Sequence, residues 1–262
     1  MICETVESLY LPYPGRKDRL VRVWVPAHAQ GETFPVVYMT DGQNLFDVES
    51  STFGCWYTRE AVRDERAVSG RAAIIVGVHN EDPWRANELM PESIGPIQCP
   101  DEVRPMLHPS GEVFDEFLVH TVMPAVEARF PVRTGRANTA FCGSSMGGLM
   151  AFFTALSHPD VYCAAAPFSP CFNLYTKDDL MRWIRSRLGA QKPYLYLFAG
   201  GADELEKEIQ RCELAIYEEL KTCYPERLLK QVVMPEQRHH ETAWEPRFRE
   251  FLHTFLTCGP EF

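Results

Sequence analysis

The chain has 262 residues, of which 45% are hydrophobic and 24% are charged, and its formal net charge is −10. This length is enough for one large α/β domain or two small ones, and a chain of this size buries a substantial core. The acidic balance, with no basic stripe to offset it, argues against nucleic acid and anionic membrane surfaces as partners.

Cysteine usage and the N-terminus indicate the cellular compartment. Nine cysteines are scattered along the chain, and none of them forms a C-x-x-C pair. The segment from Met1 to Glu4 has neither the basic nor the apolar region of a secretory signal. No apolar run approaches the ~20 residues of a membrane span. We therefore expect a cytoplasmic protein with free thiols and no membrane association.

Strands and helices alternate in the predicted order of elements. Leu20 to Pro26 alternates apolar and charged residues, which predicts a half-exposed antiparallel strand. Continuous apolar runs are typical of parallel strands covered on both faces, and they occur at residues 34–39, 72–78, 139–142, 163–168 and 194–199, with a further candidate at 229–234. Helices are predicted at residues 113–129, 148–157, 177–188, 203–223 and 242–256. This alternation predicts a mostly parallel central sheet with helices on both faces.

The segment from Glu81 to Gly111 does not fit the alternation. It contains six prolines and shows little periodicity. A loop of this length inside a compact domain is usually functional or disordered. Two interpretations remain open: a flap or partial lid over a site, and an ordinary surface insertion.

The stretch Gly143 to Gly148 reads G-S-S-M-G-G and lies between an apolar run and a helix-like run. A G-x-S-x-G pattern between a strand and a helix is typical of the nucleophile elbow of α/β-hydrolases. We expect Ser145 at the apex in a strained backbone conformation, and Gly143 and Gly147 where any side chain would collide with the neighbouring strand and helix. The fold expected for residues 1–262 is therefore a single α/β-hydrolase domain with a small cap or none.

A serine at neutral pH needs a general base within hydrogen-bond reach, and the base needs an orienting acid. In this fold the chain order is Ser, then Asp or Glu, then His. Asp203 follows the predicted strand at 194–199 and is our choice for the acid, with Glu204 in reserve. The alternative is that both carboxylates only complement the N-terminus of the next helix.

The base should follow the last strand, where His239 and His240 are adjacent in a loop before the final helix. The pair could instead bind a metal together with Glu241, but no second cluster has metal-ligand spacing. We therefore predict no metal site and no cofactor. The oxyanion hole needs two N–H donors, and we expect them at Met146, directly after the nucleophile, and at Gln43, in the loop after the strand at 34–39.

Several of these segments together resemble the putative esterase family, which includes enterochelin esterases, feruloyl esterases, S-formylglutathione hydrolase and the antigen-85 mycolyltransferases. The blocks that carry the resemblance are D-G-Q-N-L-F-D at residues 41–47, G-S-S-M-G-G at 143–148, H-P-D-V at 158–161 and the segment from His239 to Trp244. The resemblance extends over most of the chain.

The resemblance also assigns roles. Relatives commonly show His-Asn-Glu-x-x-Trp, which implies that His239 is the base and that His240 stands where Asn is usual. It favours Asp203 as the acid, because this residue stands three residues after Gly200, where relatives often carry Glu. The Asp side chain is shorter than that of Glu by one methylene. It implies Gln43 as the second oxyanion donor. The absence of an N-terminal accessory domain makes a siderophore substrate less expected.

These observations predict a serine esterase that cleaves a small-molecule carboxylic ester through an acyl-enzyme on Ser145. An acyltransferase that uses the same acyl-enzyme, and a non-catalytic binding module that retains the fold, remain alternatives. Trp56 and Phe172 are candidates for an apolar wall of the substrate site, and Arg85 is a candidate for binding a substrate carboxylate. Each of these three is equally compatible with packing or surface roles, and the oligomeric state stays open.

Overall fold

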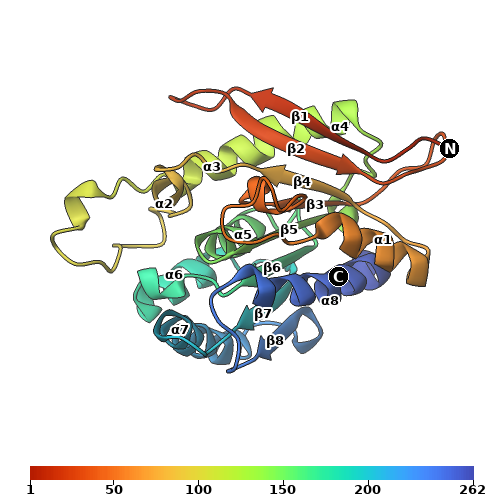
Figure 1. The fold of residues 1–262 in the computed structure, drawn as a ribbon. Coiled ribbons are helices and arrows are strands. Elements are labelled where there is room, and N and C mark those ends of the chain that lie inside the picture. The colour runs from red at the N-terminus through yellow and green to blue at the C-terminus, as the bar shows by residue number, and fades with distance from the viewer.

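The computed structural model describes residues 1–262, apart from the side chain of Pro260. Eight strands form one sheet in the order β1-β2-β4-β3-β5-β6-β7-β8 (Figure 1). Their bounds are β1 Thr5–Leu11, β2 Arg19–Val25, β3 Val36–Met39, β4 Ile74–Val78, β5 Thr139–Ser144, β6 Ala164–Phe168, β7 Tyr194–Ala199 and β8 Leu229–Val233. β2 is antiparallel to both β1 and β4, whereas β3 to β8 run parallel to one another. The mostly parallel sheet predicted from the apolar runs is confirmed.

Helices cover both faces of this sheet. α1 and α8 pack together on one face, and α3, α5, α6 and α7 contact one another in series on the other (Figure 1). The helices are α1 Thr58–Ser69, α2 Arg85–Glu88, α3 Gly111–Phe117, the π-helical turn η3 Leu118–Val122, α4 Met123–Arg129, α5 Met146–Ser157, α6 Lys177–Arg187, α7 Glu204–Leu220 and α8 Glu241–Cys258. Short 3₁₀ turns are η1 Gly42–Asn44, η2 Arg104–Met106, η4 Arg136–Asn138, η5 Phe172–Leu174, η6 Glu226–Leu228 and η7 Gly259–Glu261. Among the residues that the structure describes, no helix is both long and apolar enough to cross a membrane.

The predicted elements are present with shifts of a few residues at their ends, but the strand β1, the helix α1 and the four-residue helix α2 were not predicted. β1 is a mostly solvent-exposed edge strand, so its sequence has only a weak apolar alternation. α1 buries few apolar side chains, chiefly Ala61 and Val62, on one narrow stripe among charged residues. The helix predicted at 113–129 is continuous but passes through the π-helical turn η3, which ends two residues before Pro124. A π-turn at this point accommodates a proline that an ordinary α-helical interior would not.

The segment from Glu81 to Gly111 is mostly an insertion packed beside the sheet rather than a lid over it. In Figure 1 the part of the segment that follows α2 loops away from the strands, on the side of the molecule where α6 lies. Its apolar side chains Leu89, Met90 and Ile94 are buried. The Tyr175 hydroxyl donates a hydrogen bond of 2.6 Å to the Pro91 carbonyl, which holds the segment to the chain before α6. The surface-insertion interpretation therefore describes it better than the flap.

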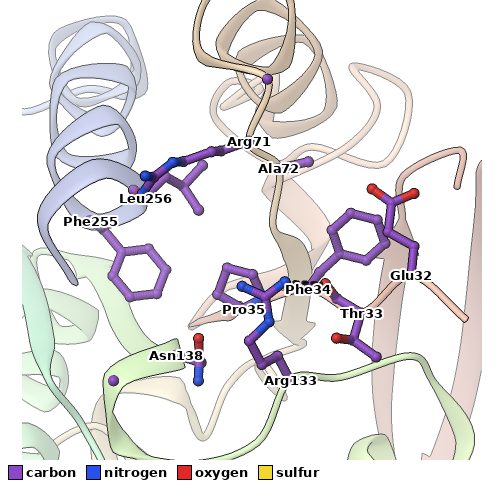
Figure 2. Close-up of a pocket in the computed structure, with 12 residues that line it drawn as sticks. Glu32, Thr33, Phe34, Pro35, Arg71, Ala72, Arg133, Asn138, Phe255 and Leu256 are labelled. Atoms are coloured by element: carbon purple, nitrogen blue, oxygen red, sulfur yellow. Dashed lines mark hydrogen bonds between the residues drawn. The ribbon is translucent and has the colours of Figure 1, made fainter. Parts of the chain in front are cut away.

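Two cavities lie at opposite edges of the sheet. The carboxyl ends of β3, β4, β5 and β8 meet at one edge, where open α/β sheets place their sites, and the segments that follow them line a cavity of about 270 Å³. The other cavity, about 430 Å³, lies near the starts of β3 and β5 between Phe34, Phe255, Arg71 and Arg133 (Figure 2). None of the predicted catalytic residues lines this second cavity.

Candidate active site

The strand β5 ends at Ser144, and α5 begins at Met146, so Ser145 alone makes the turn between them. Its backbone has φ of 60° and ψ of −123°, a conformation that non-glycine residues rarely adopt. The Ser145 N–H donates to the Phe168 carbonyl at 2.9 Å, and the Ser145 carbonyl accepts from the Cys171 N–H at 3.2 Å. These bonds hold the strained residue in place at the end of the central strands, as a nucleophile elbow requires.

Two glycines of the motif are needed for close approach. A Cβ at Gly143 would overlap the Gly147 carbonyl, and a Cβ at Gly147 would overlap the Thr40 hydroxyl. Residues with larger side chains at these positions would therefore force β5, α5 and the loop after β3 apart. The expected need for small residues on both sides of Ser145 agrees with these contacts.

The His239 imidazole contacts Glu206, not Asp203. Nδ1 of His239 lies 2.7 Å from Oε1 of Glu206, whose side chain is 0% exposed. The other carboxylate oxygen of Glu206 accepts a hydrogen bond of 2.9 Å from the Gly200 N–H. The His239 ring packs nearly perpendicular to the Trp244 ring at a centroid distance of 4.9 Å. The imidazole is thus fixed by a carboxylate on one side and an aromatic ring on another.

We predicted that Asp203 orients the His239 imidazole, and this prediction is wrong. Its Oδ1 accepts from the Glu206 N–H at 2.9 Å and its Oδ2 accepts from the His239 backbone N–H at 3.0 Å. Burial raises the pKa of Asp203, but these two hydrogen bonds outweigh burial and leave the pKa below its usual value. Asp203 is the N-cap of α7, which is the alternative that the sequence left open. Glu204 is directed to Lys207, at 2.5 Å.

The sequence does contain a signal for Glu206. The buried residues of α7 are Glu206, Ile209, Glu213, Ile216 and Leu220, which follow a helical spacing. Two carboxylates on an otherwise apolar stripe are unusual, because buried charges are rarely left without partners. The first of them, Glu206, lies one turn after the N-cap, level with the loop that carries His239.

The hydroxyl of Ser145 lies against a cysteine. Its Oγ is 3.3 Å from Sγ of Cys171, in the loop after β6. Burial raises the pKa of Cys171 to about 11, so the thiol is neutral at physiological pH. Nothing in the sequence pattern predicted this neighbour, because the chain position of Cys171 carries no motif for it.

The loop after β3 carries the expected oxyanion donor. η1 begins after Asp41, which has φ of 54° and ψ of 46°, and it places Gln43 on the wall of the cavity. A Cβ at Gly42 would lie 2.5 Å from the backbone of Gly77, so this glycine lets the loop lie directly on β4. Met146 is the first residue of α5, and the first N–H groups of a helix have no intrahelical acceptor.

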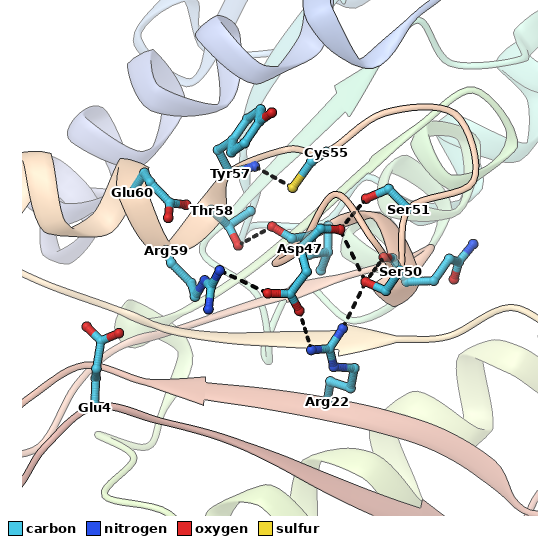
Figure 3. Close-up of polar contacts among 12 residues, drawn as sticks. Glu4, Arg22, Asp47, Ser50, Ser51, Cys55, Tyr57, Thr58, Arg59 and Glu60 are labelled. Carbon is cyan, nitrogen blue, oxygen red and sulfur yellow. Dashed lines mark hydrogen bonds and ion pairs between the residues drawn. The ribbon is translucent and has the colours of Figure 1, made fainter.

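A cluster of polar side chains holds the loop after β3 in place (Figure 3). The Asp47 carboxylate pairs with Arg22 at 2.6 Å and with Arg59 at 2.9 Å. Arg22 also donates to the Ser50 hydroxyl at 3.1 Å, and that hydroxyl donates to the Gln43 carbonyl at 2.8 Å. The carbonyl of Gln43 is therefore directed away from the cavity, toward Ser50.

The cavity brings together Ser145, His239 and Gln43, and its full lining is Asp41, Gln43, Asn44, Phe53, Asn80, Arg85, Ser144, Ser145, His239, His240, Glu241 and Trp244. Trp56 and Phe172 do not line it, so the prediction of an apolar wall from these two is wrong. Trp56 stacks on Trp244 in the core at a centroid distance of 6.0 Å, and Phe172 packs edge-on against Phe152 at 4.9 Å. Arg85 does line the cavity, but two of its nitrogens are bonded to Asp41.

Two residues beside His239 complete the rim. His240 is half-buried and caps α8 by accepting from the Thr242 N–H at 3.2 Å. Burial raises the pKa of Glu241, which accepts from the Asn44 side-chain amide at 3.3 Å. This bond joins the segment that carries His239 to the loop after β3. Within the described part of the chain, no group of three or more His, Cys, Asp or Glu side chains is arranged to hold a metal ion.

Comparisons with known proteins place this geometry in a family. The family model described as "Putative esterase" matches residues 15–250. The chain is 29% identical over 169 residues to a siderophore triacetylfusarinine C esterase of Aspergillus fumigatus, an alignment that covers 62% of this chain and 55% of the relative. It is 33% identical over 149 residues to a siderophore enterobactin esterase of Emericella nidulans, covering 53% of this chain and 48% of the relative.

The fold also has solved counterparts. The siderophore hydrolase EstA from Aspergillus nidulans superposes with a TM-score of 0.72 at 21% identity, covering 95% of this chain and 94% of that one. The alignments to the two curated relatives span about half the length of each. Because the family model matches most of the sequence, the chain belongs to the Putative esterase family, whose fold is that of the α/β-hydrolases.

Proposed function

We propose that residues 1–262 form one serine esterase domain, in which Ser145 is the nucleophile, His239 the general base and Glu206 the orienting acid. The observation that carries the proposal is the joint placement of two features at one cavity. These are the strained serine between β5 and α5 and the 2.7 Å contact between His239 and Glu206. A serine with a nearby base, itself oriented by an acid, is the arrangement that acyl transfer requires.

The reaction begins when Oγ of Ser145 leaves Cys171 and turns to Nε2 of His239. His239 accepts the serine proton while Oγ attacks the ester carbonyl, and then donates that proton to the departing alcohol. Water attacks the acyl-enzyme by the same route in reverse and releases the acid. Glu206 keeps the proton on Nδ1 and stabilises the imidazolium that forms in each half of the cycle.

The N–H groups of Gln43 and Met146 stabilise the oxyanion in this proposal. Support comes from their elements: Gln43 follows Asp41 in a tight turn on the cavity wall, and Met146 starts α5. The positive end of the α5 dipole also points toward the cavity. Each donor of this kind typically contributes about 10²–10³ in kcat.

The substrate class we propose is a carboxylic ester with polar groups near the scissile bond. The cavity wall combines one exposed aromatic ring, Phe53, with the polar side chains of Asn80 and Glu241. The named relatives act on siderophores, and the fungal siderophore hydrolase of similar fold is matched over 94% of its length. A siderophore ester is therefore within the proposed class.

The test is a hydrolysis screen over short p-nitrophenyl esters, a feruloyl ester, a thioester, and ferric and iron-free triacetylfusarinine C and enterobactin. Ser145→Ala serves as the matched control. We expect wild type to hydrolyse at least one ester at a rate that Ser145→Ala does not approach. Equal rates for the two proteins on every substrate would contradict the proposal.

A further inference from the structure

We propose that Arg85 is a positioning residue that sets the oxyanion hole through Asp41, and that it does not serve to bind the substrate. The inference rests on the proposed function, since it assigns a role within the same site. It concerns the helix α2, whose first residue, Arg85, reaches the cavity from the 81–111 segment.

One edge of the Arg85 guanidinium binds both carboxylate oxygens of Asp41. Nε donates to Oδ1 of Asp41 at 2.6 Å, and one terminal nitrogen donates to Oδ2 at 2.7 Å. The Asn80 side-chain amide donates to Oδ1 of the same carboxylate at 2.6 Å. A bidentate arginine–carboxylate pair of this kind fixes orientation as well as charge.

The carboxylate held in this way belongs to Asp41, the residue that shapes the loop after β3. Asp41 is only 7% exposed, and its positive φ of 54° turns the chain into η1, which carries Gln43. A Cβ at Gly147 would lie 3.3 Å from Oδ2 of Asp41. The Asp41 side chain thus lies against the first turn of α5, beside Met146, so it borders both of the proposed oxyanion donors.

Arg85 is itself held by a second buried ion pair. α2 contains Arg85 and Glu88, and Glu88 is 1% exposed. Arg19, at the start of β2, donates to its two oxygens at 2.8 and 2.6 Å. The pair Arg19–Glu88 therefore anchors α2 to the sheet, and α2 presents Arg85 to Asp41.

Charge explains why a cation is needed here. Burial raises the pKa of Asp41, but the attraction of Arg85 and the hydrogen bonds from Arg85 and Asn80 outweigh it and leave the pKa lowered. Asp41 is accordingly a buried anion on the wall of the cavity in which an oxyanion forms. Without Arg85 this charge would repel the oxyanion and lose the contacts that fix the loop.

The experiment compares Arg85→Gln, Asp41→Asn and the double variant, with Arg104→Gln as the matched control. Arg104 lies in the same segment, is exposed and pairs with exposed Asp101. The substrates are a neutral p-nitrophenyl ester and a p-nitrophenyl ester whose acyl group ends in a carboxylate. Inhibition by a trifluoromethyl ketone reports oxyanion stabilisation, and thermal unfolding reports folding.

We expect Arg85→Gln to lower kcat about 10–100-fold on both esters, since displacing a catalytic group by about 1 Å costs on this scale. KM should change less than about threefold, and the inhibitor should weaken in step with kcat. The double variant should be no slower than Arg85→Gln, because the two residues act through one contact. Arg85→Lys should recover only part of the loss, and Arg104→Gln should match wild type.

Three results would overturn the inference. In the first, KM rises only for the anionic ester while kcat stays unchanged, which would assign Arg85 to substrate binding. In the second, the losses of the two single variants multiply in the double variant. In the third, folded Arg85→Gln retains wild-type kcat and inhibitor affinity. Each presupposes an active wild type, whereas an inactive wild type that also fails to label at Ser145 would count against the proposed function.

Discussion

Glu206→Gln is the substitution that most sharply tests how His239 is oriented. Both carboxylate oxygens of Glu206 are acceptors: Oε1 faces Nδ1 of His239 at 2.7 Å and Oε2 faces the Gly200 N–H at 2.9 Å. A glutamine has one oxygen and one amide nitrogen. Its oxygen must face Gly200, whose N–H can only donate, so its nitrogen faces Nδ1 of His239.

The consequence is a change of tautomer. A donor opposite Nδ1 favours the imidazole with its proton on Nε2, and that nitrogen can no longer accept the proton of Ser145. A wrong tautomer in an otherwise intact triad lowers kcat about 10⁴-fold, which is about 5.5 kcal/mol of transition-state stabilisation. The side chain keeps its volume, so the fold should be retained.

Asp203→Asn is the matched comparison, because Asp203 contacts backbone N–H groups only. Losing one of these two bonds at a helix N-cap costs about 1 kcal/mol of stability, with less than about a tenfold loss of kcat. The assay is kcat and KM for both variants on one ester, with circular dichroism as a check of folding. A larger loss of kcat for Asp203→Asn than for Glu206→Gln would refute the assignment of Glu206.

Three further predictions follow from buried groups around the site. Burial raises the pKa of Glu213 well above its usual value, so the wild type loses stability as the pH rises above the unfolded value of 4.5. Each unit of difference between the pKa of Glu213 in the folded and in the unfolded protein corresponds to about 1.4 kcal/mol of unfolding free energy. Glu213→Gln should therefore gain free energy of unfolding over wild type in urea titrations as the pH goes from 5 to 8. If the free energy of unfolding of Glu213→Gln relative to wild type stays the same from pH 5 to 8, this result would count against a buried neutral acid. Cys171, with a pKa of about 11 against an ordinary 9, should react with iodoacetamide at least about 100-fold more slowly than the exposed Cys3. Peptide mass spectrometry that finds equal rates would contradict its burial in the neutral form. Gly147→Ala should lower kcat at least about tenfold and destabilise by about 1–3 kcal/mol, because the new methyl displaces the Thr40 hydroxyl; wild-type kinetics would show that the loop after β3 need not touch α5.

The sequence predicts the parts of the site that depend on local backbone geometry. Ser145 was identifiable because a strained turn between a strand and a helix needs glycines at fixed positions, and these leave a pattern in the sequence. The two candidates for the base were identifiable because the loop after the last strand leads to the same sheet edge. The resemblance then selected His239, which is the histidine that contacts a buried carboxylate.

Other parts depend on which way a side chain points within an element, and the sequence did not reveal them. Asp203 and Glu206 are one helical turn apart, and only the capping of α7 by Asp203 leaves the longer side chain of Glu206 facing the imidazole. Trp56 and Phe172 are aromatic residues near the site in the chain, yet both pack into the core. Cys171 reaches Ser145 through a long-range contact for which the sequence carries no local pattern.

Labelling with a fluorophosphonate tests the central claim most directly, because the reagent reacts with a serine only when a base activates it. We predict that the folded wild type gains one phosphonyl group and that peptide mass spectrometry finds it on Ser145. His239→Ala should label far more slowly, and Ser145→Ala should not label at all. A wild type that hydrolyses no ester and stays unlabelled, or one that is labelled at a different serine, would contradict the account.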